Sequence, residues 1–328
     1  MKRIVLGILS LALFAYSPKT EEDYLAINPV SNTSLQEEPH PGKKLMETHC
    51  YICHSPSAAE QIGRIAPPMV AIKSRYLKEG YAKEAFIKHI EDFVTNPTDE
   101  KVLMFGAVQK FGMMPKQTYP EGAVTKIAEF MFDYQIETPS WFKEHWESHG
   151  NGNWVQPGKK VVEIEKPKTL EEIGLEYALS TKKVLGQNLM EAIQKKGTVH
   201  ALEFCNIEAM PLTDSMATKH NATIKRVSDK NRNPKNKANA EELKYIEHFK
   251  KQITTKQEPK PVVLEKGEDV KFYYPITTNT MCLQCHGKTE NIQPEVRDKI
   301  KKLYPKDLAV DYGENEVRGI WSITFNKK

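Results

Sequence analysis

Two five-residue words constrain this chain more than any other feature: CYICH at residues 50–54 and CLQCH at residues 282–286. On one helical turn, positions i, i+3 and i+4 lie on the same face. Two sulfurs at this spacing can bond to one edge of a haem, and the histidine that follows can reach the iron. Cys-x-x-Cys-His is the attachment word of c-type haem, whereas a bare Cys-x-x-Cys could be a zinc knuckle or a redox pair. We therefore predict two covalently attached c-type haems, held by Cys50, Cys53, His54, Cys282, Cys285 and His286.

The first residues have the pattern of a secretory signal peptide. Lys2 and Arg3 precede an apolar run over residues 4–16, which is too short to span a membrane as a helix. Haem c is attached outside the cytoplasm, so the leader and the two words agree. We predict a signal peptide over 1–20, a flexible tail over 21–41 and a periplasmic location. No later apolar stretch is long enough to span, so we expect no transmembrane segment in the mature chain.

The formal charge of +4 does not indicate a nucleic-acid partner. Cleavage of the leader would remove Lys2 and Arg3 and leave a charge of +2. Two haems would add four propionates, so the loaded protein would carry about −2 before the iron charge is counted. We therefore expect no binding to nucleic acid.

The length of 328 residues allows two ordinary domains. Cys50 and Cys282 lie 232 residues apart, which is too far for one small haem module. Proline and glycine gather between the two halves together with three tryptophans, so we expect a linker that packs on a domain. The predicted segments are a first domain over 42–137, a linker over 138–168 and a second domain over 169–328.

Hydrophobic periodicity predicts a mixture of helices and strands in the second domain. A long amphipathic helix is expected over 169–195, because apolar residues recur there near helical spacing. A second helix should carry residues 200–205. The other predicted elements are strands over 223–227, 262–264, 270–275 and 317–325, and helices over 239–252 and 294–303, with the second haem word on a helix of its own.

The first domain resembles class I cytochrome c over about ninety residues. The resemblance rests on the word at 50–54, on Pro67-Pro68, on FGMMP at 111–115 and on helices expected over 42–50, 82–95 and 121–134. It implies an all-α cytochrome c fold, in which Met114 binds the first iron and the Pro67 carbonyl accepts the proton of His54. Met114 follows His54 by 60 residues. From the residues alone, core packing is the favoured interpretation of this methionine, and Met113, Met104 and Met69 are alternative ligands.

The second domain resembles a different family, the c-haem domains with a PAS-like fold that occur as bacterial sensor modules and as exported proteins. The resemblance spans about residues 170–325. It implies an α+β PAS-like haem domain, so the predicted fold class is multidomain. The matching words are HALEFCN at 200–206, MPLTD at 210–214, KRVS at 225–228, RNP at 232–234, FYYPI at 272–276, YP at 304–305 and RGI at 318–320.

The fifth cysteine, Cys205, is left over when four are assigned to haem. From the residues alone, an inert buried thiol is the favoured interpretation. The family resemblance implies that Cys205 is the second axial ligand of the second iron. The other candidate ligands are His200, His220, His248, Met210 and Met216.

Three arginines of the second domain are candidates for pairing with haem propionates, because a guanidinium fork matches a carboxylate. They are Arg226, Arg318 and Arg232. The alternative is a solvated, lysine-rich face between residues 219 and 260.

These features predict an exported dihaem c-type cytochrome that transfers electrons to a redox partner protein of unknown identity. Redox or gas sensing through the Cys/His-ligated haem is an additional role, with a small gas as its ligand. A pure sensor would have to signal to another protein, because the chain contains no kinase or cyclase segment. The enzymatic alternative is a dihaem peroxidase, a family that places its two words closer together in two similar folds. No catalytic residue is predicted.

Overall fold

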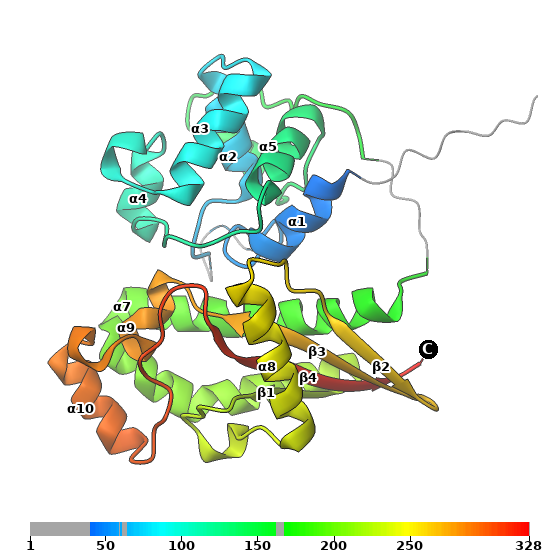
Figure 1. The fold of residues 1–328 in the computed structure, drawn as a ribbon. Coiled ribbons are helices and arrows are strands. Elements are labelled where there is room, and N and C mark those ends of the chain that lie inside the picture. Colours follow the sequence, from blue (N-terminus) through cyan, green and yellow to red (C-terminus); the bar gives the residue numbers. More distant parts are fainter. Residues whose placement is uncertain (1–39, 59, 61–63, 162–166, 328) are drawn as a thin grey trace, which may run out of the picture. The chain divides into compact units, whose positions relative to one another are not determined.

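The computed structural model describes residues 40–327 except 59, 61–63 and 162–166 (Figure 1). The predicted signal peptide and nearly all of the predicted tail lie outside the described residues. The stretches 40–161 and 167–327 are considered in turn. No helix in either stretch is long and apolar enough to cross a membrane.

The first stretch is built from helices around one apolar cluster. The three predicted helices are confirmed within two residues at each end, and they form α1 (Pro41–His49), α3 (Lys83–Thr95) and α5 (Ala123–Asp133). The structure adds α2 (Met69–Lys78), η2 (Asp99–Lys101), α4 (Phe105–Phe111) and α6 (Phe142–Ser148). The apolar faces of α1, α2, α3 and α5 meet in the core, whose fully buried side chains include Met46, Phe86, Phe130 and Met131.

Helix α1 crosses α5 at a glycine. A Cβ atom at Gly42 would lie 2.0 Å from the Lys126 carbonyl oxygen and 2.6 Å from the Phe130 Cβ, so only a residue without a side chain fits here. The close approach fixes the orientation of α1 against α5. Cys50 is the C-terminal cap of α1, and its N–H donates to the Met46 carbonyl (2.8 Å), so the position of Cys50 follows from the orientation of the helix. The first haem word is therefore positioned by a helix crossing.

The segment predicted as a linker packs against the first core and contains α6. Trp141, Trp146 and Trp154 all lie against the apolar cluster, as the sequence predicted for this segment. A fully buried lysine of α2 ties the segment down: Lys73 Nζ donates to the Tyr134 carbonyl (2.5 Å) and the Pro157 carbonyl (2.7 Å). Burial lowers the pKa of Lys73 to about 8.

The second stretch contains one antiparallel sheet of four strands in the order β1-β4-β3-β2 (Figure 1). The strands are β1 (Thr223–Val227), β2 (Val262–Lys266), β3 (Asp269–Thr277) and β4 (Val317–Asn326), which confirms the four predicted strands with small extensions. The last strand of the chain is inserted between β1 and β3, so residues about 90 positions apart become hydrogen-bonded neighbours, such as Val227 opposite Ile320.

The sheet is covered by a helix on each face. Side chains alternate along β3 and β4, so Phe272, Trp321 and Ile323 pack with the long helix α7 (Leu170–His220), while Tyr273 and Ile320 pack with α8 (Ala240–Thr254). Both helices begin with a capping box, formed by Thr169 with Glu172 and by Asn239 with Glu242. These caps explain why the helices start where they do.

Helix α7 is broken in the place where the sequence predicts a gap between two helices. Gly197 has φ 80° and ψ 173°, a conformation that favours glycine, and it separates the two halves. The second half extends far beyond the predicted 200–205 and ends at His220. It continues through Pro211, and at the far end His220 stacks on Tyr177 of the first half with ring centroids 4.3 Å apart.

The remaining elements surround the second haem word. The word lies on α9 (Thr280–His286), followed by η4 (Thr289–Asn291) and α10 (Pro294–Leu303). Apolar residues of α10 pack on Leu202 of α7 and on Cys285. A loop over 304–316 then returns to the word before β4 begins; Asp311 N–H donates to the Gly287 carbonyl (2.9 Å) and Tyr312 N–H to the His286 carbonyl (3.0 Å).

Candidate functional sites

The first word forms a tight turn directly after α1. The amide N–H groups of Cys53 and His54 both donate to the Cys50 carbonyl, at 3.1 and 2.8 Å. All three residues are half-buried, and both cysteines carry free thiols. The turn holds the two sulfurs and the imidazole close together, as attachment to a single flat group requires.

His54 is oriented by a backbone carbonyl. Its Nδ1–H donates to the Pro67 carbonyl oxygen over 2.6 Å, and burial lowers the pKa of the imidazole. The neutral ring with its proton on Nδ1 presents an unprotonated Nε2, which is the form that binds a metal ion. The structure thus brings together Pro67 and His54, which the sequence analysis linked only through the family resemblance.

The candidate methionines of the first stretch fall into two groups. Met69 is buried in the apolar core. Met113 and Met114 are half-buried in the segment after α4, where Gly112 turns the chain with φ 81°. Met104 is also half-buried, immediately before α4. Met114 therefore stays a predicted ligand, with Met113 beside it.

The second word lies within a helix, unlike the first. Asn279 caps α9 and accepts hydrogen bonds from the Cys282 N–H and Sγ, both over 3.2 Å. Helical spacing then places Cys282, Cys285 and His286 on one face of a single turn. The structure confirms the predicted helix over the second word.

His286 is oriented in the same way as His54. Its Nδ1–H donates to the Ala309 carbonyl over 2.7 Å, which again leaves Nε2 for a metal ion. Burial lowers the pKa of His286 well below its ordinary value, and the charges of Arg232 and Arg318 lower it further. The two words thus share a histidine–carbonyl bond, although the acceptor follows 13 residues after His54 and 23 residues after His286.

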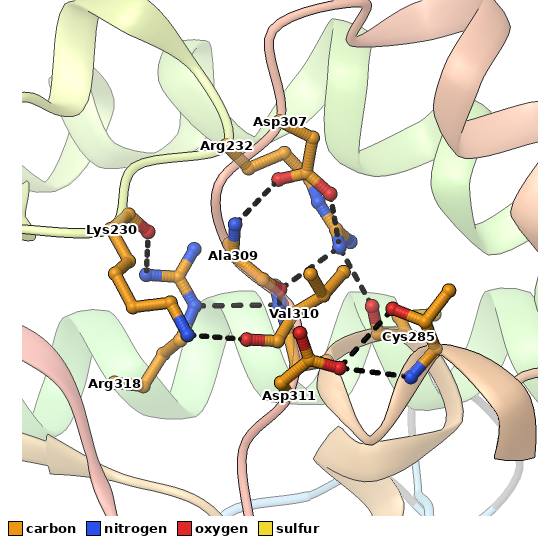
Figure 2. A network of polar contacts seen from close by, with 10 residues as sticks. Lys230, Arg232, Cys285, Asp307, Ala309, Val310, Asp311 and Arg318 are labelled. Carbon is orange, nitrogen blue, oxygen red and sulfur yellow. Dashed lines mark hydrogen bonds and ion pairs between the residues drawn. The ribbon is translucent and has the colours of Figure 1, made fainter.

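Arg232 joins the second word to the loop that provides this carbonyl (Figure 2). It forms a buried ion pair with Asp307 (2.9 Å), in which the two side chains are 9% and 7% exposed. The same nitrogen donates to the Cys285 carbonyl (2.7 Å) and the Ala309 carbonyl (3.2 Å). Arg232 therefore fixes the distance between the word and Ala309.

Arg318 approaches His286 from β4. Its Nη1 donates to the Ser228 hydroxyl (2.9 Å) and the Lys230 carbonyl (3.1 Å), and its Nε lies 3.4 Å from His286 Nδ1. Figure 2 places Arg318 and Lys230 beside each other, and both cations lie over the Tyr312 ring, at 5.5 and 4.5 Å from its centroid.

Cys205 belongs to the same site. It is a half-buried free thiol on the second half of α7. Burial raises the pKa of the Cys205 thiol, while the positive charges of Arg226 and Arg232 oppose that rise. Burial also raises the pKa of Cys285 to about 11, with the charge of Cys205 as a further cause. Cys205 and the second word therefore lie within electrostatic range of each other.

The charge balance of the second site fits an anionic group. Arg226, Arg232 and Arg318 gather around it, and Asp307 compensates Arg232. In the described part of the chain, no carboxylate lies within ion-pair distance of Arg226 or Arg318. Arg226 donates to the Ala209 carbonyl (3.2 Å), and the Arg232 Nε is a buried donor without a hydrogen-bond partner among the described residues. Two propionates would supply the missing negative charge and acceptors.

A family model described as Tll0287-like (Tll0287) matches residues 120–326, which is more than half of the chain. The chain belongs to the Tll0287-like family. The matched range contains the second haem word and Cys205, and it begins after the first word.

Two individual proteins are similar to this chain. An uncharacterized protein of Aquifex aeolicus (strain VF5) is 30% identical in an alignment of 124 residues, and the match covers 33% of this chain and 82% of that protein. A structure described as that of the cyanobacterial heme-protein Tll0287 covers 49% of this chain and 98% of its own, with 18% identity and a TM-score of 0.38.

Sequence reasoning missed the acceptor of the second site and underestimated Arg232. Ala309 acts through its carbonyl, which every residue carries, so no side-chain pattern marks it. Arg232 was the third candidate for a propionate, but its side chain binds Asp307 and two backbone carbonyls. Its position after Ser228 in a loop between β1 and η3 (Pro234–Asn236) gave no signal of this role.

Proposed function

We propose that this protein is an exported dihaem c-type cytochrome that transfers electrons, with a class I cytochrome c domain before the Tll0287-like part. The observation that supports the proposal best is the repeated local geometry. Each Cys-x-x-Cys-His word has its two thiols on one turn and a histidine whose Nδ1–H donates to a backbone carbonyl, at 2.6 and 2.7 Å. A haem, when bound, supplies an iron that changes oxidation state by one electron.

The residues around each word would hold and tune such a group. Cys50, Cys53, Cys282 and Cys285 would provide the thioether bonds, while His54 and His286 would each present Nε2 to an iron. Pro67 and Ala309 would hold the two imidazoles in one orientation and raise their basicity. Arg226 and Arg318 are the cations available to propionates of the second haem.

The second ligands would differ between the two sites. Met114 would give the first iron a thioether, which favours the reduced metal and a high potential. Cys205 would give the second iron a thiolate, which stabilises the oxidised metal and lowers the potential. Cys205 and the second word both lie within residues 120–326, the range matched by the Tll0287-like family model. Two different potentials suit transfer of electrons between a donor and a partner protein.

The proposal is tested on protein made with its leader in a host that matures c-type cytochromes. Mass spectrometry should find two added haem masses in protein recovered from the periplasm. A redox titration followed by optical and paramagnetic spectra should resolve two separated midpoint potentials. Protein without added haem mass would overturn the proposal.

A cysteine variant with a matched control tests the second ligand. Cys205→Ala should change the low-spin ferric signal of the second haem and leave that of the first haem unchanged. The control is Ser215→Ala, a similar truncation on the exposed side of the same helix half, which should change neither signal. An unchanged low-spin signal in Cys205→Ala would eliminate Cys205 as a ligand.

Ligand uptake and turnover separate the remaining functions. Binding of carbon monoxide or nitric oxide to the reduced second haem would support a sensing role through displacement of Cys205. Electron transfer alone predicts that neither gas binds. Rapid consumption of hydrogen peroxide would instead favour the peroxidase alternative.

A further inference from the structure

The two candidate haem histidines provide an internal comparison. Both donate Nδ1–H to a backbone carbonyl at nearly the same distance, 2.6 Å for His54 and 2.7 Å for His286. Two guanidinium groups lie close to the second of these bonds: the Arg318 Nε is 3.4 Å from the His286 Nδ1, and Arg232 donates to the same Ala309 carbonyl (3.2 Å). The difference between the two sites therefore lies in the charges around the imidazole.

The two guanidinium groups have different surroundings. Arg232 is neutralised by Asp307, so its contribution is mainly the hydrogen bonds to the Cys285 and Ala309 carbonyls. Arg318 donates to two neutral acceptors, the Ser228 hydroxyl and the Lys230 carbonyl, with the Tyr312 ring beside it, and the charge of Asp307 acts on it without a direct ion pair. Among the described residues, Arg232 therefore has a direct carboxylate partner and Arg318 has none.

Arg318 acts on His286 through its charge. If Nε2 binds iron, the Nδ1 must carry the proton that is donated to the Ala309 carbonyl. A protonated Nδ1 has no lone pair, so it cannot accept a hydrogen bond from the Arg318 Nε at 3.4 Å. The guanidinium instead places a positive charge beside the edge of the imidazole. In a buried site such a charge is weakly screened.

We propose that Arg318 is a positioning residue that raises the reduction potential of the second centre, by holding a positive charge beside the Nδ1 of His286. The inference rests on the proposed function, because it requires His286 to be an iron ligand. A nearby cation disfavours the oxidised, more positive metal and weakens electron donation by the imidazole. Arg318 would thus oppose the lowering of the potential by the Cys205 thiolate.

The test is the midpoint potential of the second haem in three variants of the full-length, haem-loaded protein. Arg318→Gln removes the charge and keeps donors for Ser228. Arg318→Lys keeps the charge. Arg297→Gln is the matched control, because it makes the same change on α10, where Arg297 Nη1 donates to the exposed Thr289 carbonyl (3.4 Å). The first haem of each sample is the internal reference.

We expect Arg318→Gln to lower the ratio of reduced to oxidised second haem at least tenfold at a fixed ambient potential, which equals a shift of about 59 mV for one electron. Arg318→Lys should change the ratio by less than about threefold, which is under half of that shift. Arg297→Gln and the first haem should not change. An unchanged or raised second potential in Arg318→Gln, with both haems attached, would overturn the inference.

Two checks keep the outcomes distinct. If Arg318→Gln does not accumulate with its haems, Arg318→Lys is the deciding variant. A tenfold fall in the ratio of reduced to oxidised second haem in this variant, which keeps the charge, would overturn the role of charge, whereas a change of less than about threefold would support it. Haem mass on the wild-type chain separates the two proposals. Absence of the second haem defeats the proposed function, whereas its presence with an unmoved potential defeats only the inference about Arg318.

Discussion

Replacement of Gly42 by alanine should destabilise the helical core of the first stretch, although alanine is the better helix former. Gly42 lies in α1 with a helical backbone, so its conformation does not exclude alanine. The space does: the new Cβ would be 2.0 Å from the Lys126 carbonyl oxygen and 2.6 Å from the Phe130 Cβ. Both obstacles belong to or adjoin the α5 backbone, which a side-chain rotation cannot move, so α1 and α5 must separate.

The size of the effect follows from two opposing terms. Alanine in a helix is favoured over glycine by about 0.5–1 kcal/mol. Overpacking of a well-packed core costs about 1–3 kcal/mol, and the backbone obstacle puts this site at the upper end. We therefore expect a net loss of about 2 kcal/mol. Gly106 of α4 is the control, because a Cβ there meets no atom within 4 Å, and Gly106→Ala should be neutral or stabilising.

The assay is urea unfolding of the haem-loaded protein followed by tryptophan fluorescence. Trp141, Trp146 and Trp154 pack on the first core, so the signal reports mainly on this domain. With a urea dependence of about 1–3 kcal/mol per molar, a loss of about 2 kcal/mol should lower the midpoint of Gly42→Ala by about 1 M. A Gly42→Ala midpoint equal to that of the wild type would refute the argument, since it would mean that the two helices separate without cost.

Three further predictions concern a buried amine, a ligand and a strand contact. Burial lowers the pKa of Lys73 from an ordinary 10.5 to about 8, so the unfolded chain binds more protons than the folded chain between these two pH values. The free energy of unfolding of the wild type, measured relative to Lys73→Met by urea midpoints, should therefore rise across that pH range by at most about 3 kcal/mol. A difference that does not change with pH would contradict the burial argument. Met114→Leu should lower the potential of the first haem in a redox titration, whereas Met113→Leu should leave it unchanged; the opposite pattern would assign the ligand to Met113. A Cβ atom at Gly319 would lie 2.4 Å from the Val227 carbonyl oxygen. Gly319→Ala should therefore lower the melting temperature, measured by calorimetry, by several degrees. A melting temperature equal to that of the wild type would show that β1 can shift away from Gly319 without loss of stability.

Much of the local structure followed from short-range patterns. The helices over 82–95 and 239–252, the four strands and the gap before His200 were all predicted, because periodicity and capping act between residues a few positions apart. Helix α6 was missed, since seven residues between proline and glycine clusters give little periodic signal. The end of α7 at His220 was missed because Pro211, a helix breaker in most sequences, lies inside it.

The sequence by itself determined the presence of two Cys-x-x-Cys-His words and a fifth cysteine, and the family whose model matches residues 120–326. Tertiary structure decided how each word is supported. The Ala309 carbonyl, the Arg232–Asp307 pair and the approach of Arg318 to His286 join residues 23 to 75 positions apart. Every residue carries a backbone carbonyl, and the effect of a charge depends on distance in space rather than on separation along the chain. No sequence pattern therefore predicts these contacts. They form only when β4 and the loop before it fold against the second word.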